Sequence, residues 1–452
     1  MDLLIANGLV HSGDGVQAGD VLVRHGRIAA IAPDLGGRAA GTRVIDAGGL
    51  PVVPGFIDFH VHADDEIGRW TLADDLDSAS AVAVGNAVTT LVGFATQGAR
   101  ETLADTASRY AAKVPGHSRC DVAFHLTPTG DGWDWAALAR LAGRGFRTVK
   151  LYTTYRQAGL FSSWELLAEV MPRLGELGLR LLLHCEDDAV MAGVDLRQVD
   201  LCDPFSHTLL RPSRAEVAAV GHAIALARQT GCPLHVVHIS TPDAAAAIEA
   251  ARGHQEISGE TCPQYLLLSD QGLRGPGGHR LLCSPPLRAE AERARLEALA
   301  AAGGLDLLAT DHCPFRRADK DHFNGDYRAV PAGIPGLGAL VPLMHEWLVE
   351  RHGRPLEELV RLLAANPARL AGLWPRKGVI REGADADLVV LDPAGPERPV
   401  RSTLADAHDP WAGRTTRLTC RHVLLRGVEV VRDGVVLDVP PSGRACQPPA
   451  ND

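Results

Sequence analysis

The chain has 452 residues, of which 46 % are hydrophobic and 22 % are charged, so it is long and apolar enough to bury a large core. Its formal net charge at pH 7 is −10, and it contains no run of basic residues. This balance argues against nucleic acid or an anionic membrane as the main partner, because phosphate groups bind to clustered cations.

The N-terminal residues 1–53 contain short strand-like pieces, such as DVLVRHGRIAAIAP, separated by Gly and Asp turns. Similar pieces return near the C-terminus, for example GVIREGADADLVVLD. We therefore predict one small β-sandwich assembled from residues 1–53 and 372–440. The apolar stretch in MDLLIANGLV is too short for a signal peptide or a membrane span, so we expect a cytoplasmic protein.

The stretch PGFIDFHVH at 54–62 ends in two histidines one residue apart. Side chains alternate between the two faces of a β-strand, so His60 and His62 are expected to point the same way. This arrangement offers two imidazoles to one metal ion. The alternative is a partly exposed edge strand that carries two unrelated histidines.

Apolar runs alternate with helical stretches such as SWELLAEVMPRLGELG through the middle of the chain. Eight such runs occupy 55–62, 89–96, 120–128, 148–155, 179–187, 233–241, 257–266 and 305–315. Nearly continuous apolar strands that alternate with helices are typical of a parallel sheet covered by helices. We therefore predict an α/β fold in which residues 54–371 form a (β/α)₈ barrel.

Polar side chains gather toward the ends of these runs, where the active site of such a barrel lies. They are His60 and His62, Lys150, His184, His238, and Asp311 with His312. A core histidine satisfied by a neighbouring hydrogen bond is the alternative for any one of them. Five strands that each bring such a side chain to the same end together indicate a metal centre.

Lys150 is one of only four lysines, and it lies within the apolar run TVKLYTTY. A buried ammonium is costly unless its charge is paired or removed. It could form an ion pair with a barrel carboxylate such as Asp311. Alternatively, the neutral amine could react with carbon dioxide to form a carbamate, an anion whose two oxygens could bridge two metal ions that hold a hydroxide between them.

Several segments together resemble the cyclic amidohydrolases, and most closely dihydropyrimidinase and D-hydantoinase. These segments are PGFIDFHVH, KLYTTY, LLLHCED, HVVHIST, GETCPQYL, CSPPLR, ATDHCPF, AANPARLAGL and KGVIREGADADLVVLDP, in order over about residues 1–440. The resemblance implies a barrel with a terminal β-sandwich and two Zn²⁺ ions per chain, bridged by Lys150 as an N6-carboxylated lysine. It also implies that His60 and His62 bind the more buried ion and that His184 and His238 bind the second.

The same resemblance implies hydrolysis of a cyclic amide or imide by a hydroxide that bridges the two metal ions. Asp311 would ligate the buried ion and transfer the proton to the leaving nitrogen, and Tyr155 would stabilise the oxyanion. Tyr155 could instead be only an aromatic residue at the barrel rim. Ser284 matches a serine whose backbone contacts the substrate. His312 is expected to support the metal-binding residues without binding the metal itself.

Two departures from the family pattern concern the substrate. Ala332 stands where the family has a substrate-contacting asparagine. Asp64 stands where dihydroorotases have an arginine that binds a carboxylate, so dihydroorotate is disfavoured. The acidic stretch 64–66 is either a solvated loop or the border of a pocket for a polar or cationic substituent. Spacing between Lys150 and Tyr155 favours a hydantoinase over an allantoinase.

The chain could also be a mononuclear N-acyl-D-amino-acid deacylase, or a catalytically silent relative that serves as an oligomeric scaffold. Lys150 disfavours the deacylase, and the complete set of expected metal ligands disfavours the silent relative. The expected partners are a small-molecule substrate and further copies of the chain, in a homotetramer or a dimer. We expect residues 441–452 to form an extended tail or an arm that contacts a partner.

The nine cysteines are an odd number and include no Cys-x-x-Cys pair. Most of them lie singly in apolar stretches, which predicts small buried residues in a reducing compartment. A zinc site built from thiolates is the less favoured hypothesis.

Overall fold

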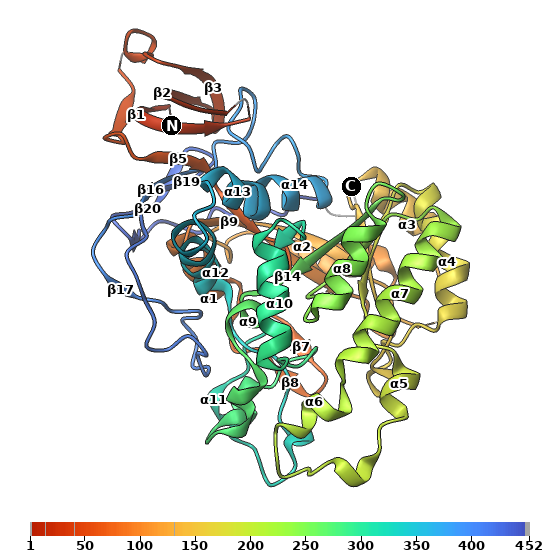
Figure 1. Cartoon of the computed structure of the whole chain (residues 1–452). Helices are drawn as coiled ribbons and strands as arrows, with labels where there is room; N and C mark the ends of the chain where they lie inside the picture. The colour runs from red at the N-terminus through yellow and green to blue at the C-terminus, as the bar shows by residue number, and fades with distance from the viewer. Residues whose placement is uncertain (1, 14, 40, 131, 448–452) are drawn as a thin grey trace.

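The computed structural model describes residues 2–13, 15–39, 41–130 and 132–447. Eight parallel strands form its central sheet in the spatial order β15-β14-β13-β12-β11-β10-β9-β6 (Figure 1). Their bounds are β6 (Phe56–Asp58), β9 (Val88–Thr96), β10 (Asp121–Thr127), β11 (Thr148–Tyr152), β12 (Arg180–His184), β13 (Leu234–Val236), β14 (Ile257–Thr261) and β15 (Leu307–Leu308). The sheet is nearly closed, because Val61 forms a parallel bridge with His312 and the His62 amide donates to the His312 carbonyl (2.7 Å). The predicted (β/α)₈ barrel is therefore confirmed.

Amphipathic helices cover the outer face of the barrel. In α4, for example, Leu167, Val170, Met171 and Leu174 are buried at three- and four-residue spacing, and the helix begins after Ser163, whose hydroxyl accepts from the Leu166 amide. The covering helices are α1 (Leu76–Gly85), α2 (Leu103–Ala112), α3 (Trp135–Gly143), α4 (Trp164–Glu176), α7 (Ser213–Thr230), α8 (Pro242–Ala251), α10 (Glu290–Ala301), α12 (Leu340–His345), α13 (Leu356–Val360) and α14 (Asn366–Leu370). No helix within the described part of the chain is both long and apolar enough to cross a lipid bilayer.

Strands from both ends of the chain form a second sheet of nine strands, in the order β21-β20-β19-β16-β5-β1-β2-β3 with β4 paired to β1. Their bounds are β1 (Leu3–Ser12), β2 (Gly15–Arg24), β3 (Arg27–Ala32), β4 (Arg43–Asp46), β5 (Pro51–Pro54), β16 (Leu388–Asp392), β19 (Thr419–Leu425), β20 (Val428–Arg432) and β21 (Val435–Val436). Strand β5 joins the two halves, because it pairs with β1 on one side and with β16 on the other. The expected sheet domain built from both termini is present, while its exact boundaries at residues 53 and 372 stay a prediction.

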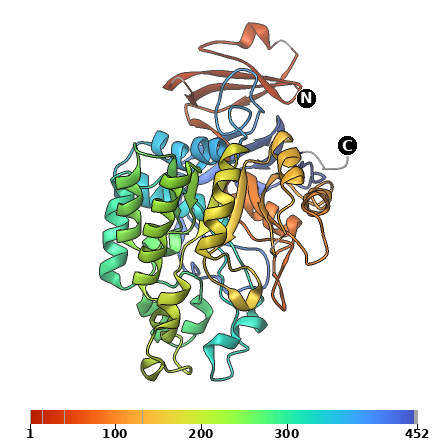
Figure 2. The ribbon, with the colours of Figure 1, turned by 90° about the vertical axis from the view of Figure 1, so that its right-hand side faces the viewer.

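The terminal sheet and the polar end of the barrel lie at opposite ends of the molecule. In Figures 1 and 2 the N-terminal strands are at the top, and the connections that follow the barrel strands are at the bottom. Those connections contain the small hairpin β7 (Glu66–Ile67) and β8 (Trp70–Thr71), and the short helices α5 (Asp188–Ala192), α6 (Ser206–Leu210), α9 (Pro263–Leu267) and α11 (Arg317–Lys320). The hairpin β17 (Arg398–Pro399) and β18 (Thr415–Thr416) belongs to the C-terminal part.

The last described residues return to the barrel. The Val122 amide donates to the Arg444 carbonyl (2.9 Å), and the Cys446 amide donates to the Val122 carbonyl (2.7 Å). Gln447 adds a side-chain contact, because its Oε1 accepts from the Phe124 amide (3.1 Å). Of the expected tail, residues 443–447 thus lie alongside β10, and residues 448–452 lie outside the described residues.

A buried ion cluster joins the barrel to the terminal sheet. The Lys377 ammonium lies 2.7 Å from Asp121, the first residue of β10, and 3.5 Å from Asp385. It also pairs with Asp387, just before β16, and only 2 % of the Lys377 side chain is exposed. Burial alone would lower the pKa of Lys377, but the carboxylates of Asp387 and Asp121 raise it above its usual range. These three aspartates lie close enough together for a metal ion, but Lys377, Arg426 and Arg376 already pair with them.

We expect the substitution Lys377→Met to lower the free energy of unfolding by about 3–5 kcal/mol, because it leaves the buried Asp387 carboxylate without its cation. Urea denaturation followed by circular dichroism would measure the loss. Lys113→Met is the matched control, since Lys113 pairs with Asp64 in a partly exposed position and should cost at most about 1 kcal/mol. Equal losses of unfolding free energy in both variants would contradict the expectation that a buried ion pair contributes more to stability than a partly exposed one.

Candidate metal centre

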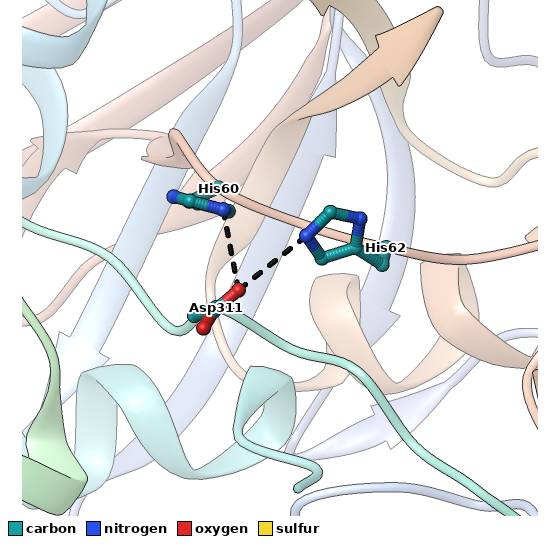
Figure 3. A group of neighbouring side chains, drawn as sticks. All are labelled: His60, His62 and Asp311. Atoms are coloured by element: carbon teal, nitrogen blue, oxygen red, sulfur yellow. Dashed lines mark ion pairs between the residues drawn. The ribbon is translucent and has the colours of Figure 1, made fainter. Parts of the chain in front are cut away.

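Three predicted ligands meet where the first and eighth barrel strands end. His60 and His62 lie on the segment directly after β6, and Asp311 follows β15. The Asp311 Oδ1 atom lies 3.2 Å from His60 Nε2 and 3.4 Å from His62 Nε2. Figure 3 shows both rings directed at this carboxylate. Their ligand atoms all lie within 4.8 Å of one another, as a shared cation requires.

His184 and His238 lie beside this group. His184 is the last residue of β12, and His238 lies two residues beyond β13 with a left-handed φ of 39°. The ring centroids of His184 and His238 are 4.5 Å apart, and those of His60 and His238 are 5.4 Å apart. His238 thus lies next to both His60 and His184, so the structure brings the two predicted ligand groups together.

Lys150 lies within β11 and is only 1 % exposed. Its Nζ atom is 5.4 Å from the Phe94 ring centroid and 5.0 Å from that of Tyr152. Burial lowers its pKa to about 8, although the carboxylates of Glu260 and Asp311 act to raise it. No carboxylate of the described residues forms an ion pair with Lys150, so the alternative of a direct Lys150–Asp311 pair is not found. About a tenth of this amine is therefore neutral at pH 7.

The protonation state of these imidazoles is the one that binds a metal ion. Burial lowers the pKa of His60 and of His238, and it lowers that of His184 to about 4. At pH 7 these rings are therefore neutral, and each has one nitrogen lone pair to offer. The Nδ1 atom of His238 is buried without a hydrogen-bond partner among the described residues. An unpartnered buried nitrogen beside four other ligand-type side chains fits a metal site.

Two buried glutamates that the sequence analysis did not single out hold the metal-facing histidines. Glu260 in β14 lies 2.6 Å from His60 Nδ1 through one oxygen and 3.1 Å from His235 Nε2 through the other. Glu186 lies 2.7 Å from His184 Nε2. A carboxylate behind a histidine fixes its ring and its tautomer, as is usual for metal ligands. The only signal in the sequence was an acidic residue inside an apolar run.

Tyr155 and Ser284 lie on the same side of the site. Tyr155 has a left-handed φ of 68°, which turns its ring to within 5.0 Å of the His184 ring centroid. Burial raises the pKa of Tyr155 to about 12, so its hydroxyl stays protonated at neutral pH. The Ser284 hydroxyl hydrogen-bonds with Tyr155 and lies 3.3 Å from His207 Nε2. The structure thus brings both predicted substrate-facing residues near His184.

Ala332 and His312 occupy different surroundings. Ala332 is exposed, and the amide of its neighbour Gly333 donates to the Leu282 carbonyl (2.8 Å), which places it beside the segment that leads to Ser284. His312 is fully buried and lies 3.2 Å from Asp74 through Nε2, while its Nδ1 accepts from the Gly336 amide (3.1 Å). Only Nδ1 of His312 has a hydrogen-bond partner among the described residues, while Nε2 lies close to the Asp74 carboxylate, and its expected role in supporting the site stays a prediction.

Two residues of the acidic stretch 64–66 are turned toward α2. The Tyr110 hydroxyl donates to Asp65 Oδ2 (2.5 Å), and the Lys113 ammonium lies 3.3 Å from Asp64 Oδ2. Glu66, at the start of β7, remains exposed. The carboxylates of Asp64 and Asp65 are thus already bonded within the protein, which weakens the hypothesis that they recognise a cationic substituent.

Comparison with known proteins extends the resemblance over the whole chain. The model of the amidohydrolase family matches residues 176–430. A D-hydantoinase of Streptomyces coelicolor is 34 % identical over 451 residues, which cover 95 % of this chain and 94 % of that protein. A D-phenylhydantoinase of Escherichia coli is 32 % identical over 445 residues, covering 96 % and 95 %. The crystal structure of dihydropyrimidinase from Brevibacillus agri superimposes with a TM-score of 0.91 at 29 % identity and covers 99 % of this chain and 100 % of that one.

Proposed function

This chain belongs to the amidohydrolase family and is a cyclic amidohydrolase, and from that premise we propose that it opens hydantoin or dihydropyrimidine rings with the help of two zinc ions bridged by carboxylated Lys150. One observation carries the proposal. A fully buried lysine with no carboxylate partner among the described residues lies in the same barrel mouth as four histidines and Asp311. Carboxylation would convert this buried cation into the anion that such a cluster needs.

The side chains divide into two sets around Lys150. We assign His60, His62 and Asp311 to one zinc ion and His184 and His238 to the other. When bound, such a metal pair lowers the pKa of water enough to supply hydroxide at neutral pH and polarises a carbonyl oxygen. Glu260 and Glu186 hold the His60 and His184 rings in the orientation that leaves one nitrogen free.

Hydrolysis adds one water molecule across the ring C–N bond, so one proton must move from the water to the departing nitrogen. We assign this transfer to Asp311, whose carboxylate lies between both histidines of the first set. The Tyr155 hydroxyl, with its raised pKa, can donate a hydrogen bond to the oxyanion that forms at the attacked carbonyl carbon. The backbone near Ser284 is assigned to the amide edge of the ring.

The competing functions differ in what they require of the chain. A dihydroorotase would need a cation near position 64, where Asp64 instead pairs with Lys113. A mononuclear deacylase needs no anion that bridges two metal ions, so this function would not explain the buried Lys150. An allantoinase differs only in the ring it accepts. A silent relative would keep the fold without binding metal, and a homotetramer or dimer is compatible with each of these functions.

A single preparation can distinguish these functions. The protein would be expressed with zinc and bicarbonate, its zinc content measured, and its activity tested on hydantoin, 5-substituted hydantoins, dihydrouracil, allantoin and dihydroorotate. We expect about two zinc ions per chain and turnover of the hydantoins or dihydrouracil. A metal-free protein that hydrolyses none of these compounds would overturn the proposal in favour of the silent relative.

A further inference from the structure

Arg211 lies between two parts of the candidate site. It directly follows α6, in the long connection between β12 and α7, and only 14 % of its side chain is exposed. Its guanidinium pairs with the Glu186 carboxylate and also packs against the Tyr155 ring, with its central carbon 5.0 Å from the ring centroid. One planar cation therefore contacts both the partner of His184 and the residue assigned to the oxyanion.

Glu186 transmits this contact to His184. Its Oε2 atom binds the Arg211 guanidinium and accepts from His184 Nε2 at 2.7 Å, and the side chain is fully buried. An ionised carboxylate can only accept, so Nε2 carries the imidazole proton and Nδ1 keeps its lone pair. Without the arginine, Oε2 of Glu186 would lose one of its two hydrogen-bond partners, and with it the contact that fixes where the carboxylate meets the His184 ring.

The backbone of Arg211 reaches the other histidine of the pair. Its carbonyl accepts from Arg288 Nη1 (2.6 Å), and Arg288 Nε donates to the Ser240 hydroxyl (2.9 Å). Glu216 closes this network by accepting from the amides of Ser240 and Thr241, both at 3.0 Å. Ser240 and Thr241 follow His238 closely along the chain, so the network holds the turn that presents this histidine.

We propose that Arg211 is a positioning residue whose side chain aligns His184 with Tyr155 and whose backbone carbonyl takes part in the network beside His238. This inference rests on the proposed two-zinc function and deepens it. The simpler explanation is that the Arg211–Glu186 pair only stabilises the connection between β12 and α7. Positioning predicts separate effects on zinc affinity and on turnover, whereas a stabilising pair predicts a change in stability alone.

The substitutions Arg211→Met and Arg211→Lys test these effects separately. In Arg211→Met, zinc affinity of one of the two sites should fall by about 10- to 100-fold, because Glu186 no longer fixes the His184 ring. Arg211→Lys keeps a cation for Glu186 but has no planar face for Tyr155, so it should retain both zinc ions and lose kcat by about 10-fold or more with little change in KM. Zinc affinity would be measured on metal-free protein by competition with a chromophoric chelator.

Arg252→Met is the matched control, because Arg252 forms a similar pair with Asp306 (2.6 Å), just before β15 at the opposite end of that strand from Asp311. It should change thermal stability while leaving zinc affinity and kcat as in the unsubstituted protein. If Arg211→Met fails to fold, Arg211→Lys still decides the matter, and wild-type kcat in that variant would overturn the inference. If the unsubstituted protein itself binds no zinc and hydrolyses no cyclic amide, the proposed function has failed rather than the assignment of Arg211.

Discussion

Replacing Lys150 with alanine is expected to lower kcat by about 10³-fold or more and to reduce bound zinc below two ions per chain, because the variant lacks the anion that joins the two sets of ligands. The measurements are turnover of hydantoin and zinc per chain after dialysis. The low exposure of Lys150 and its pKa of about 8 are what make its amine suited to carboxylation. An alanine variant with full activity would remove the carbamate from the proposal.

Two controls sharpen this experiment. Short carboxylic acids such as acetate or propionate should restore part of the activity of Lys150→Ala, since their carboxylate can occupy the space that the side chain leaves. Lys320→Met serves as the matched lysine, because Lys320 is also fully buried, has its pKa lowered by burial to about 7, and donates to the Leu282 carbonyl (3.0 Å). It should retain both zinc ions, and zinc loss in both variants would show that any buried lysine has this effect.

The substitution Asp311→Asn is expected to lower kcat by about 10²- to 10⁴-fold while the protein still folds, because asparagine can bind a metal but cannot accept a proton. In the metal-free protein with an unmodified Lys150, burial would raise the pKa of Asp311, but His60, His62 and Lys150 hold it below its ordinary value of 3.8. The carboxylate is therefore ionised throughout the neutral range. The variant should be slow at every pH from 6 to 9, as measured by steady-state kinetics, and a rate that recovers toward either end of that range would argue for a different proton acceptor.

The sequence predicted the order of the barrel strands better than their lengths. The run at 233–241 forms a strand only over Leu234–Val236, and the run at 305–315 only over Leu307–Leu308. In both cases the apolar pattern continues into a buried connection that leaves the sheet to present His238 or Asp311. Both residues have positive φ angles, 39° and 51°, which alternation of apolar residues cannot reveal. The apolar run that predicts each strand therefore extends beyond the strand, into residues that form part of the candidate site.

His60 and His62 both point toward Asp311, although neither residue lies in a β-strand. The interpretation placed both on a β-strand, whereas β6 ends at Asp58. The chain bends at residues 59 and 60, but the Val61 amide donates to Val92 (3.1 Å) and the His62 amide to His312 (2.7 Å). These bonds keep the segment beside its neighbouring strands, and both rings point to Asp311.

The carboxylates and arginines behind the ligands could not be predicted. Glu260 and His60 are 200 positions apart in the chain, and Arg288 and Arg211 are 77 apart. Their pairing depends on which strands are neighbours in the closed barrel and on how each connection returns to its mouth. A buried charge in an apolar run, such as Glu260 or Glu186, signals only that some partner exists.

The pairing of residues 443–447 with β10 has a consequence for folding. Strand β10 pairs with β11 at a single position, Leu126 with Val149, so the segment 443–447 is a second neighbour for the first half of β10. The Phe124 amide and the Gln447 side chain that it bonds are 323 positions apart in the chain. Completing this edge therefore carries a large loop-closure entropy, and such long-range pairing is expected to form late in folding.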